Sequence, residues 1–88
     1  MNLINEISEI VAKLETSVEV EQFLNEVLTE SEIETLSKRW RILKLLKDGV
    51  SQREIAKDLG VSLCKITRGS RLLKNENSIT ARYLIKEK

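Results

Sequence analysis

The sequence predicts an all-α fold of about six short helices, and three observations indicate this class. Apolar residues recur at helical spacing along the chain, long strand-like alternation is absent, and none of the 88 residues is Pro. Several predicted helices also begin at a Ser or Thr that can cap them. A chain of this length forms at most one small domain, here 1–88.

Two amphipathic stretches predict the first two helices. One apolar stripe runs from Leu3 to Leu14 and a second from Val20 to Leu28, with Thr16-Ser17 between them as a cap or break. Aromatic residues make up 3% of the chain, so the core must be aliphatic and small. Oligomerisation is a usual remedy when so short a chain buries too little surface.

A capping box from Thr29 to Glu32 predicts the start of a third helix. One face of this helix carries the apolar residues Ile33, Leu36, Trp40 and Leu43. Because Trp40 lies on this stripe, we expect its side chain in the core. Gly49 follows Asp48 and predicts a left-handed cap that ends the helix.

Residues 51–74 carry the sharpest signal, which is that of a helix-turn-helix. Ser51 to Glu54 is a second capping box, and Ser62 can cap the second helix of the pair. Ala56 is small where the two helices pass close, and Gly60 lies four residues later, where the turn needs a left-handed residue. The apolar contacts between the helices are expected from Ile55, Leu59, Val61 and Ile66. An ordinary helical hairpin is the alternative reading.

A turn at Asn75 to Ser78 separates this pair from the last predicted helix, over 78–88. Ser78 can cap that helix, whose apolar residues include Ile79, Tyr83 and Leu84.

The net charge of +1 conceals a strong asymmetry along the chain. Residues 1–37 hold nine acidic residues and one basic residue, a net charge of −8. Residues 38–74 hold eleven basic and three acidic residues, a net charge of +8. A basic block of this size in a near-neutral chain indicates a polyanionic partner such as nucleic acid. Simple solvation of charged helix faces is the alternative.

In a helix-turn-helix the second helix lies in the major groove of DNA and the first helix crosses the DNA backbone. Arg53 can read guanine edges in bidentate fashion, whereas Lys65 and Arg71 are expected to contact phosphates without specificity. The full set of expected DNA-binding residues is Gln52, Arg53, Lys57, Ser62, Leu63, Lys65, Thr67, Arg68 and Arg71.

Gly69 is unusual because it lies inside the predicted second helix, where a glycine costs roughly 1 kcal/mol relative to alanine. Two explanations stay open. One is close packing against another helix, and the other is the close approach of a small ligand to the backbone beside Arg68.

The composition excludes several classes of function. A single cysteine, Cys64, excludes a disulfide scaffold, and the lack of His removes zinc sites and Ser-His or Cys-His catalysis. No apolar stretch approaches the roughly 20 residues that span a bilayer, and Glu6 and Glu9 stand where a signal peptide is basic. We therefore expect a soluble, cytoplasmic domain that is not an enzyme, binds no metal and has no membrane partner.

Several short sequence blocks in the centre of the chain are distinctive as a set. They are Leu28-Thr29, Arg39 and Arg41 with Ile42, Ser51 to Ile55, Leu59-Gly60, Ile66 to Ser70 and Leu73-Lys74. On these blocks the stretch from Leu28 to Lys74 resembles the Trp repressor superfamily, and the spacing from Arg39 to Ser51 is similar to that of its YerC-like branch.

The resemblance implies an intertwined homodimer that binds a double-stranded DNA operator and represses transcription. Residues 1–47 would supply the dimerisation helices, 51–74 the helix-turn-helix and 78–88 a C-terminal helix. Trp repressor is itself one of the proteins that exemplify the helix-turn-helix docking geometry on DNA.

The resemblance further implies L-tryptophan as a corepressor, with no other cofactor. In the family an indole lies between two arginines, and an arginine and a threonine hold the acid group. These positions correspond to Arg39, Arg68 and Thr29, and Gly69 corresponds to the glycine that lets the ligand approach. Guanidinium groups stack on aromatic rings and also pair with carboxylates.

Two positions depart from the family pattern. The family serine that contacts the amino group of the ligand falls at Leu72, which cannot form a side-chain hydrogen bond, and a pocket-side threonine falls at Lys65. A ligand-independent DNA-binding regulator of the YerC type is therefore the alternative function. A helical protein-interaction module is a second alternative.

Overall fold

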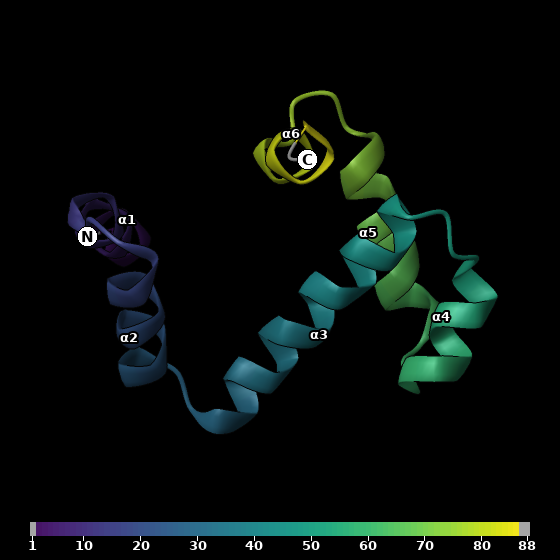
Figure 1. The fold of residues 1–88 in the computed structure, drawn as a ribbon, viewed down its shortest axis with the longest axis horizontal. Coiled ribbons are helices and arrows are strands. Elements are labelled where there is room, and N and C mark those ends of the chain that lie inside the picture. The colour runs from purple at the N-terminus through teal and green to yellow at the C-terminus, as the bar shows by residue number, and fades with distance from the viewer. Residues whose placement is uncertain (1, 87–88) are drawn as a thin grey trace. The chain divides into compact units, whose positions relative to one another are not determined.

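The computed structural model describes residues 2–86, and within this part of the chain all regular structure is helical (Figure 1). The all-α prediction is therefore confirmed. The helices are α1 (Leu3–Lys13), α2 (Ser17–Val27), α3 (Glu30–Lys47), α4 (Gln52–Leu59), α5 (Leu63–Lys74) and α6 (Ile79–Lys86). Residues 87 and 88, which the sequence assigns to the last helix, lie outside the described residues.

The chain divides into two compact units, one up to Glu34 and the other from Thr35 on. The N-terminal unit holds α1, α2 and the first turn of α3, and the C-terminal unit holds the rest of α3 with α4, α5 and α6. The division of the chain into 1–47, 51–74 and 78–88 by role stays a prediction.

The N-terminal unit consists of short capped helices with exposed apolar faces. Asn2 caps α1 by accepting a hydrogen bond from the backbone N–H of Asn5 at 3.0 Å, and Thr16 caps α2 through the N–H of Glu19 at 3.1 Å. The Thr16 cap was expected from the sequence, and the Asn2 cap was not. Neither α1 nor α2 has a buried residue, so the stripe that begins at Leu3 is largely exposed.

The predicted capping box opens α3. The N–H of Glu32 donates to Thr29 Oγ1 at 3.1 Å, and the N–H of Thr29 donates to Glu32 Oε1 at 2.8 Å. At the other end of the helix Gly49 has a φ of +90°, the left-handed conformation expected there. The local signals therefore define both ends of this helix.

The core of the C-terminal unit is a small aliphatic cluster. Ile42 of α3, Ile55 of α4 and Ile66 of α5 form its centre, and the last two are fully buried. The surrounding half-buried residues are Leu45, Leu46, Val50, Ala56, Leu59 and Val61. Helix α6 packs on α5 and buries Ala81 and Leu84. This composition agrees with the expectation of a small aliphatic core.

The expectation that Trp40 lies in the core is wrong, because its side chain is 46% exposed. The buried positions of α3 are Ile42 and Leu43, which lie two and three residues closer to the C-terminal end of the helix. The prediction treated the whole apolar stripe as covered. In the C-terminal unit, however, the cluster with α4 and α5 covers only the last turns of α3, so Leu36 is also 46% exposed.

Among the described residues, no helix combines the length and the apolar character that crossing a membrane requires.

Candidate functional site

Helices α4 and α5 form a pair joined by a turn of three residues. Gly60 has a φ of +64° and ends α4, and Ser62 caps α5 by accepting a hydrogen bond from the N–H of Lys65 at 3.4 Å. Ser51 caps α4 in the same way through the N–H of Glu54 at 3.2 Å. The two helices pack together, and the buried side chains of Ile55 and Ile66 join them. These are the local features predicted for residues 51–74.

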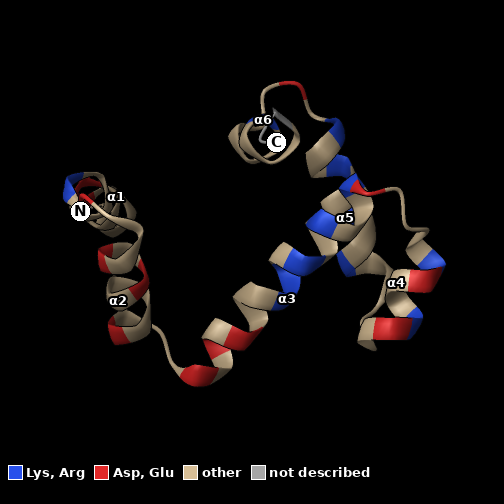
Figure 2. Cartoon of the chain, viewed as in Figure 1, with Lys and Arg blue, Asp and Glu red and all other residues tan. Residues whose placement is uncertain are grey.

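The buried and exposed sides of α5 are sharply different. Ile66 and Gly69 are buried, whereas Lys65, Arg68 and Arg71 are exposed. In Figure 2 basic residues follow α5 and the later turns of α3, while acidic residues prevail along α2 and the first turns of α3. Packing of the apolar side on α3 and α4 therefore leaves the cations of α5 available to a polyanion.

The expected DNA-binding residues differ in how far they are exposed. Thr67 and Gln52 are half-buried, and Thr67 Oγ1 donates a hydrogen bond of 3.4 Å to Gln52 Oε1, which ties α5 to the start of α4. The exposed members of the set are Arg53, Lys57, Ser62, Leu63, Lys65, Arg68 and Arg71.

A cavity of about 260 Å³ lies between α3 and α5. It brings together Arg39, Arg68 and Gly69, three of the four residues expected at a ligand site. The remaining lining residues are Ile42, Leu43, Lys65 and Leu72. The fourth expected residue, Thr29, is not among the lining residues and caps α3 in the N-terminal unit.

Gly69 forms part of a close approach between α5 and α3. A Cβ atom at this position would lie 3.3 Å from Leu43 Cδ2, 3.3 Å from Leu46 Cδ1 and 3.5 Å from Ile42 Cγ2. The first two distances are tighter than ordinary contacts. The packing explanation for this glycine is therefore sufficient, and a ligand approaching it stays a prediction.

A second cavity, of about 240 Å³, shares Arg39, Ile42 and Lys65 with the first. It adds Lys38, which the sequence reasoning did not single out, although Lys38 stands in the basic run that ends at Arg41. The other residues that line it are Thr35, Gly60, Val61 and Ser62. The two cavities therefore lie next to each other near the start of α5.

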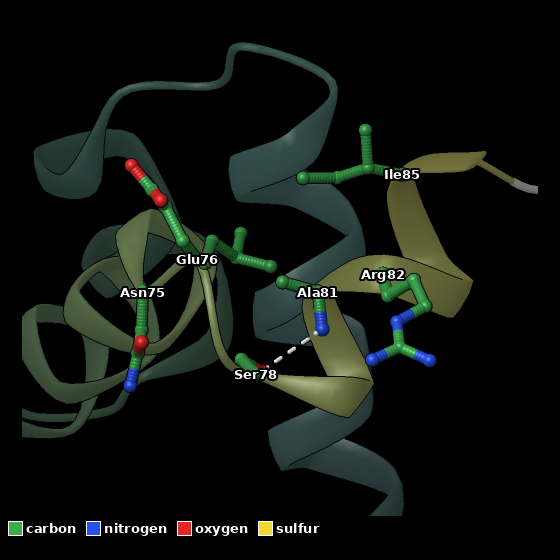
Figure 3. A pocket seen from close by; sticks show the side chains of 7 residues that line it. Asn75, Glu76, Ser78, Ala81, Arg82 and Ile85 are labelled. Carbon is green, nitrogen blue, oxygen red and sulfur yellow. Dashed lines mark hydrogen bonds between the residues drawn. The ribbon is translucent and has the colours of Figure 1, made fainter.

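A third cavity, of about 280 Å³, lies between α5 and α6, where the sequence reasoning placed no site (Figure 3). Its lining residues are Leu73, Asn75, Glu76, Ser78, Ala81, Arg82 and Ile85. Ser78 Oγ is occupied there as the cap of α6, accepting a hydrogen bond of 3.0 Å from the N–H of Ala81. Glu76 and Arg82 lie on opposite sides of the cavity, so its lining combines one negative and one positive side chain and has no surplus of either charge.

Comparison with known proteins gives one consistent result. The profile of the family described as Trp repressor protein matches residues 2–88. A Trp operon repressor homolog of Xylella fastidiosa (strain M23) is 44% identical over 69 residues, which are 77% of this chain and 75% of that protein. A Trp operon repressor homolog of Vibrio parahaemolyticus is 40% identical over 73 residues, 82% of this chain and 71% of that protein.

A third relative, a Trp operon repressor homolog of Chlamydia trachomatis serovar D, is 36% identical over 77 residues, 82% of each chain. No solved structure matches significantly.

Proposed function

The chain belongs to the Trp repressor protein family, and on this premise we propose that it is a sequence-specific DNA-binding repressor of transcription. The observation that carries this proposal is the division of α5 into a buried apolar side and an exposed basic side. Lys65, Arg68 and Arg71 lie on the exposed side, and no acidic residue stands in the first turn of the helix. A cation row of this kind on the second helix of a helix-turn-helix suits the major groove of an operator.

The contact between Gln52 and Thr67 supports this docking. Because Gln52 Oε1 accepts the hydroxyl of Thr67, the amide N–H groups of Gln52 are left to donate to DNA. Backbone phosphates accept such hydrogen bonds and fix the register of the protein on the duplex. The first turn of α4 would then cross the DNA backbone while α5 enters the groove, a geometry that Trp repressor itself exemplifies.

We propose further that the protein acts as a homodimer through its N-terminal helices. Units of fewer than about 40 residues usually need oligomerisation, a metal or disulfides to be stable. The unit that ends at Glu34 has no buried residue on α1 or α2, and its apolar stripe includes Leu3, Ile4 and Ile7 at 59%, 71% and 41% exposure. A second copy could cover this stripe and place two α5 helices about one DNA turn apart.

The cavity lined by Arg39 and Arg68 is proposed as the effector site, with L-tryptophan as the corepressor. Two guanidinium groups at one cavity suit an aromatic ring and a carboxylate. The alternative is a regulator that binds DNA without a ligand, which Leu72 and Lys65 in the lining favour because neither residue can accept a hydrogen bond from the ligand. A DNA-binding regulator of this kind would act in the cytoplasm.

The DNA-binding proposal is tested by selecting duplexes from a random pool and measuring the affinity of the selected duplex by fluorescence anisotropy. We expect Arg71→Ala to weaken binding by about tenfold or more and to lower the salt slope by about one. The matched control is Arg82→Ala, which removes the same charge from an exposed residue of α6. Loss of affinity of the same size in both variants, or no selection of any sequence, would contradict the placement of α5 in the groove.

The corepressor is tested by calorimetric titration of the protein with L-tryptophan. Heat that disappears in Arg68→Ala would support the effector site. A folded, dimeric protein that gives no heat would support the ligand-independent alternative.

A further inference from the structure

The second cavity, of about 240 Å³, lies between the middle of α3 and the turn before α5. Three cations line it, Lys38, Arg39 and Lys65, and no acidic residue of the described chain is in its lining. Thr35 and Ser62 add hydroxyl groups, so five of the eight lining residues have a polar side chain. Three positive charges beside hydroxyl groups suit an anion with several acceptor oxygens, and a phosphate group has this character.

The lining of the second cavity differs from that of the first. Ile42, Leu43 and Leu72 give the first cavity an apolar floor. Of these only Ile42 also lines the second cavity, where Val61 is the other apolar side chain. Lys38 lines the second cavity and not the first. A flat apolar ligand therefore has little surface to cover in the second cavity, and a compact anion suits its chemistry better.

The place of this cavity points to the DNA backbone as the source of the phosphate. Ser62 and Lys65 line the cavity, are exposed, and are also among the residues expected to contact DNA. Ser62 Oγ accepts a hydrogen bond from the N–H of Lys65, which leaves its own hydroxyl hydrogen to donate. When α5 enters a major groove, its start lies beside the phosphates that border the groove. A phosphate held there would share the cavity with Lys38, which is also exposed.

We propose that the second cavity is a phosphate site of the DNA interface, in which Lys38 holds one backbone phosphate of each half-site together with Ser62 and Lys65. Lys38 belongs to α3, so this inference rests on the proposed DNA-binding function and extends its interface beyond the helix-turn-helix. A lysine is a point charge, and a phosphate contact carries no sequence information. Lys38 would therefore add affinity and fix the register of the protein on the duplex without changing which sequence is preferred.

The first test measures the affinity of the intact protein for its selected duplex by fluorescence anisotropy over a range of salt concentrations. We expect Lys38→Ala to weaken binding at least about fivefold and to lower the salt slope by about one for each copy of the chain on the duplex. Lys38→Arg keeps the charge and should restore most of the affinity.

Lys44→Ala is the matched control for this test. Lys44 is exposed on the same helix and lines neither cavity beside α5. Two residues turn a helix by about 200°, so Lys44 lies almost opposite Ile42, which lines the cavity. Because its charge is more distant from the proposed phosphate, the control should change the affinity by less than about twofold.

The second test locates the phosphate. A duplex that carries one methylphosphonate in place of one phosphate loses a single backbone charge and keeps its base sequence. We expect one such position in each half-site to weaken binding of the unchanged protein at least about fivefold and that of Lys38→Ala less than about twofold, because the variant has already lost the contact. The same duplex should keep its full effect on Lys44→Ala.

Calorimetric titration of the protein without DNA, with inorganic phosphate and pyrophosphate as probes, distinguishes a DNA phosphate from that of a small phosphorylated molecule. We expect dissociation constants above about 1 mM for both probes, because a free phosphate lacks the other contacts of the duplex. Tighter binding that Lys38→Ala abolishes would assign the cavity to a free ligand and overturn the inference.

An unchanged salt slope in Lys38→Ala also overturns the inference, and so does a set of methylphosphonates whose effects are all independent of Lys38. In these cases the proposed DNA-binding function still stands, provided that Arg71→Ala weakens binding. If no duplex is selected, or if Arg71→Ala binds as tightly as the unchanged protein, the proposed function and the inference both fail.

Discussion

The two compact units differ in how fully a single chain buries their apolar residues. The C-terminal unit buries Ile55 and Ile66 fully and closes a small core around them. The N-terminal unit has equally regular helices and well-formed caps, yet no residue of α1 or α2 is fully buried, and apolar residues such as Val11, Phe23 and Leu24 are only half-buried. Local signals are therefore as strong in one unit as in the other. The difference is that α3, α4 and α5 offer one another complementary apolar faces, whereas the stripe of α1 stays largely exposed.

The largest expected effect concerns the N-terminal unit, whose apolar stripe on α1 is largely exposed. Ile7 is 41% exposed on the apolar stripe of α1. In the proposed homodimer, Ile7→Asp would bury an unpaired carboxylate, so we expect the dimer dissociation constant to rise at least about 100-fold. Sedimentation equilibrium over a range of protein concentrations measures this constant.

Ser8→Asp is the matched control, because it adds the same charge at the next residue, which is exposed and polar. Its effect on the dissociation constant should be small. If both variants associate as the unchanged protein does, the stripe of α1 does not form the dimer interface.

The next largest expected effect concerns the core of the C-terminal unit. Ile66→Ala removes a fully buried side chain from the core, and we expect the free energy of unfolding to fall by about 2 to 5 kcal/mol. Ile79→Ala is the control, since Ile79 is 61% exposed on α6 and should change stability by less than about 0.5 kcal/mol. Urea unfolding followed by circular dichroism compares them. Similar losses at the two positions would show that the core is not where the structure places it.

The contrast between the units also explains which structural features could be predicted from the sequence and which could not. Helix ends were predictable because their signals are local: Thr16, Thr29, Ser51, Ser62 and Ser78 all accept the expected backbone hydrogen bonds. Burial was less predictable because it depends on neighbours. A stripe on one helix shows which side is apolar but not how much of its length another helix covers, and for this reason Trp40 was wrongly placed in the core.

The candidate site shows the same limit in a different form. Arg39, Arg68 and Gly69 could be named from a resemblance, and the structure brings them to one cavity. Lys38 could not, because nothing in its spacing distinguishes it from the other cations of its basic run. Its place in the second cavity depends on how the turn before α5 packs beside α3.

A smaller effect concerns the caps that both units share. Ser51→Ala removes the acceptor for the N–H of Glu54, so we expect the free energy of unfolding to fall by about 1 kcal/mol. Ser8→Ala is the control, because Ser8 lies inside α1, where its hydroxyl bonds to the carbonyl of Ile4 and alanine has the higher helix propensity. Ser51→Ala should therefore lower the urea midpoint, whereas Ser8→Ala should raise it or leave it unchanged. Equal destabilisation would indicate that the loss is not specific to the cap.

The smallest expected change in stability is at Gly69, where two terms oppose each other. Replacing glycine by alanine inside α5 favours the helix by about 1 kcal/mol. The added methyl would lie 3.3 Å from the ends of Leu43 and Leu46, and these flexible side chains must give way by a few tenths of an ångström. We expect the net change in the free energy of unfolding of Gly69→Ala to stay within about 1 kcal/mol.

The same methyl should nevertheless act strongly on the cavity, because it enters among Ile42 and Leu43 on the floor where the ring of a ligand would lie. Calorimetric titration with L-tryptophan, the proposed corepressor, should therefore show a loss of binding of at least about tenfold. Gly49→Ala provides the opposite pattern: its φ of +90° makes alanine strained by about 1 to 2 kcal/mol, and no side chain lies within 4 Å to be displaced. Gly49→Ala should lower the free energy of unfolding and leave the affinity for the ligand unchanged, whereas Gly69→Ala should lower the affinity and leave stability nearly unchanged. This pair of results would separate the role of Gly69 in the cavity from its role in helix packing. Binding that survives Gly69→Ala would leave close packing as the sole reason for this glycine.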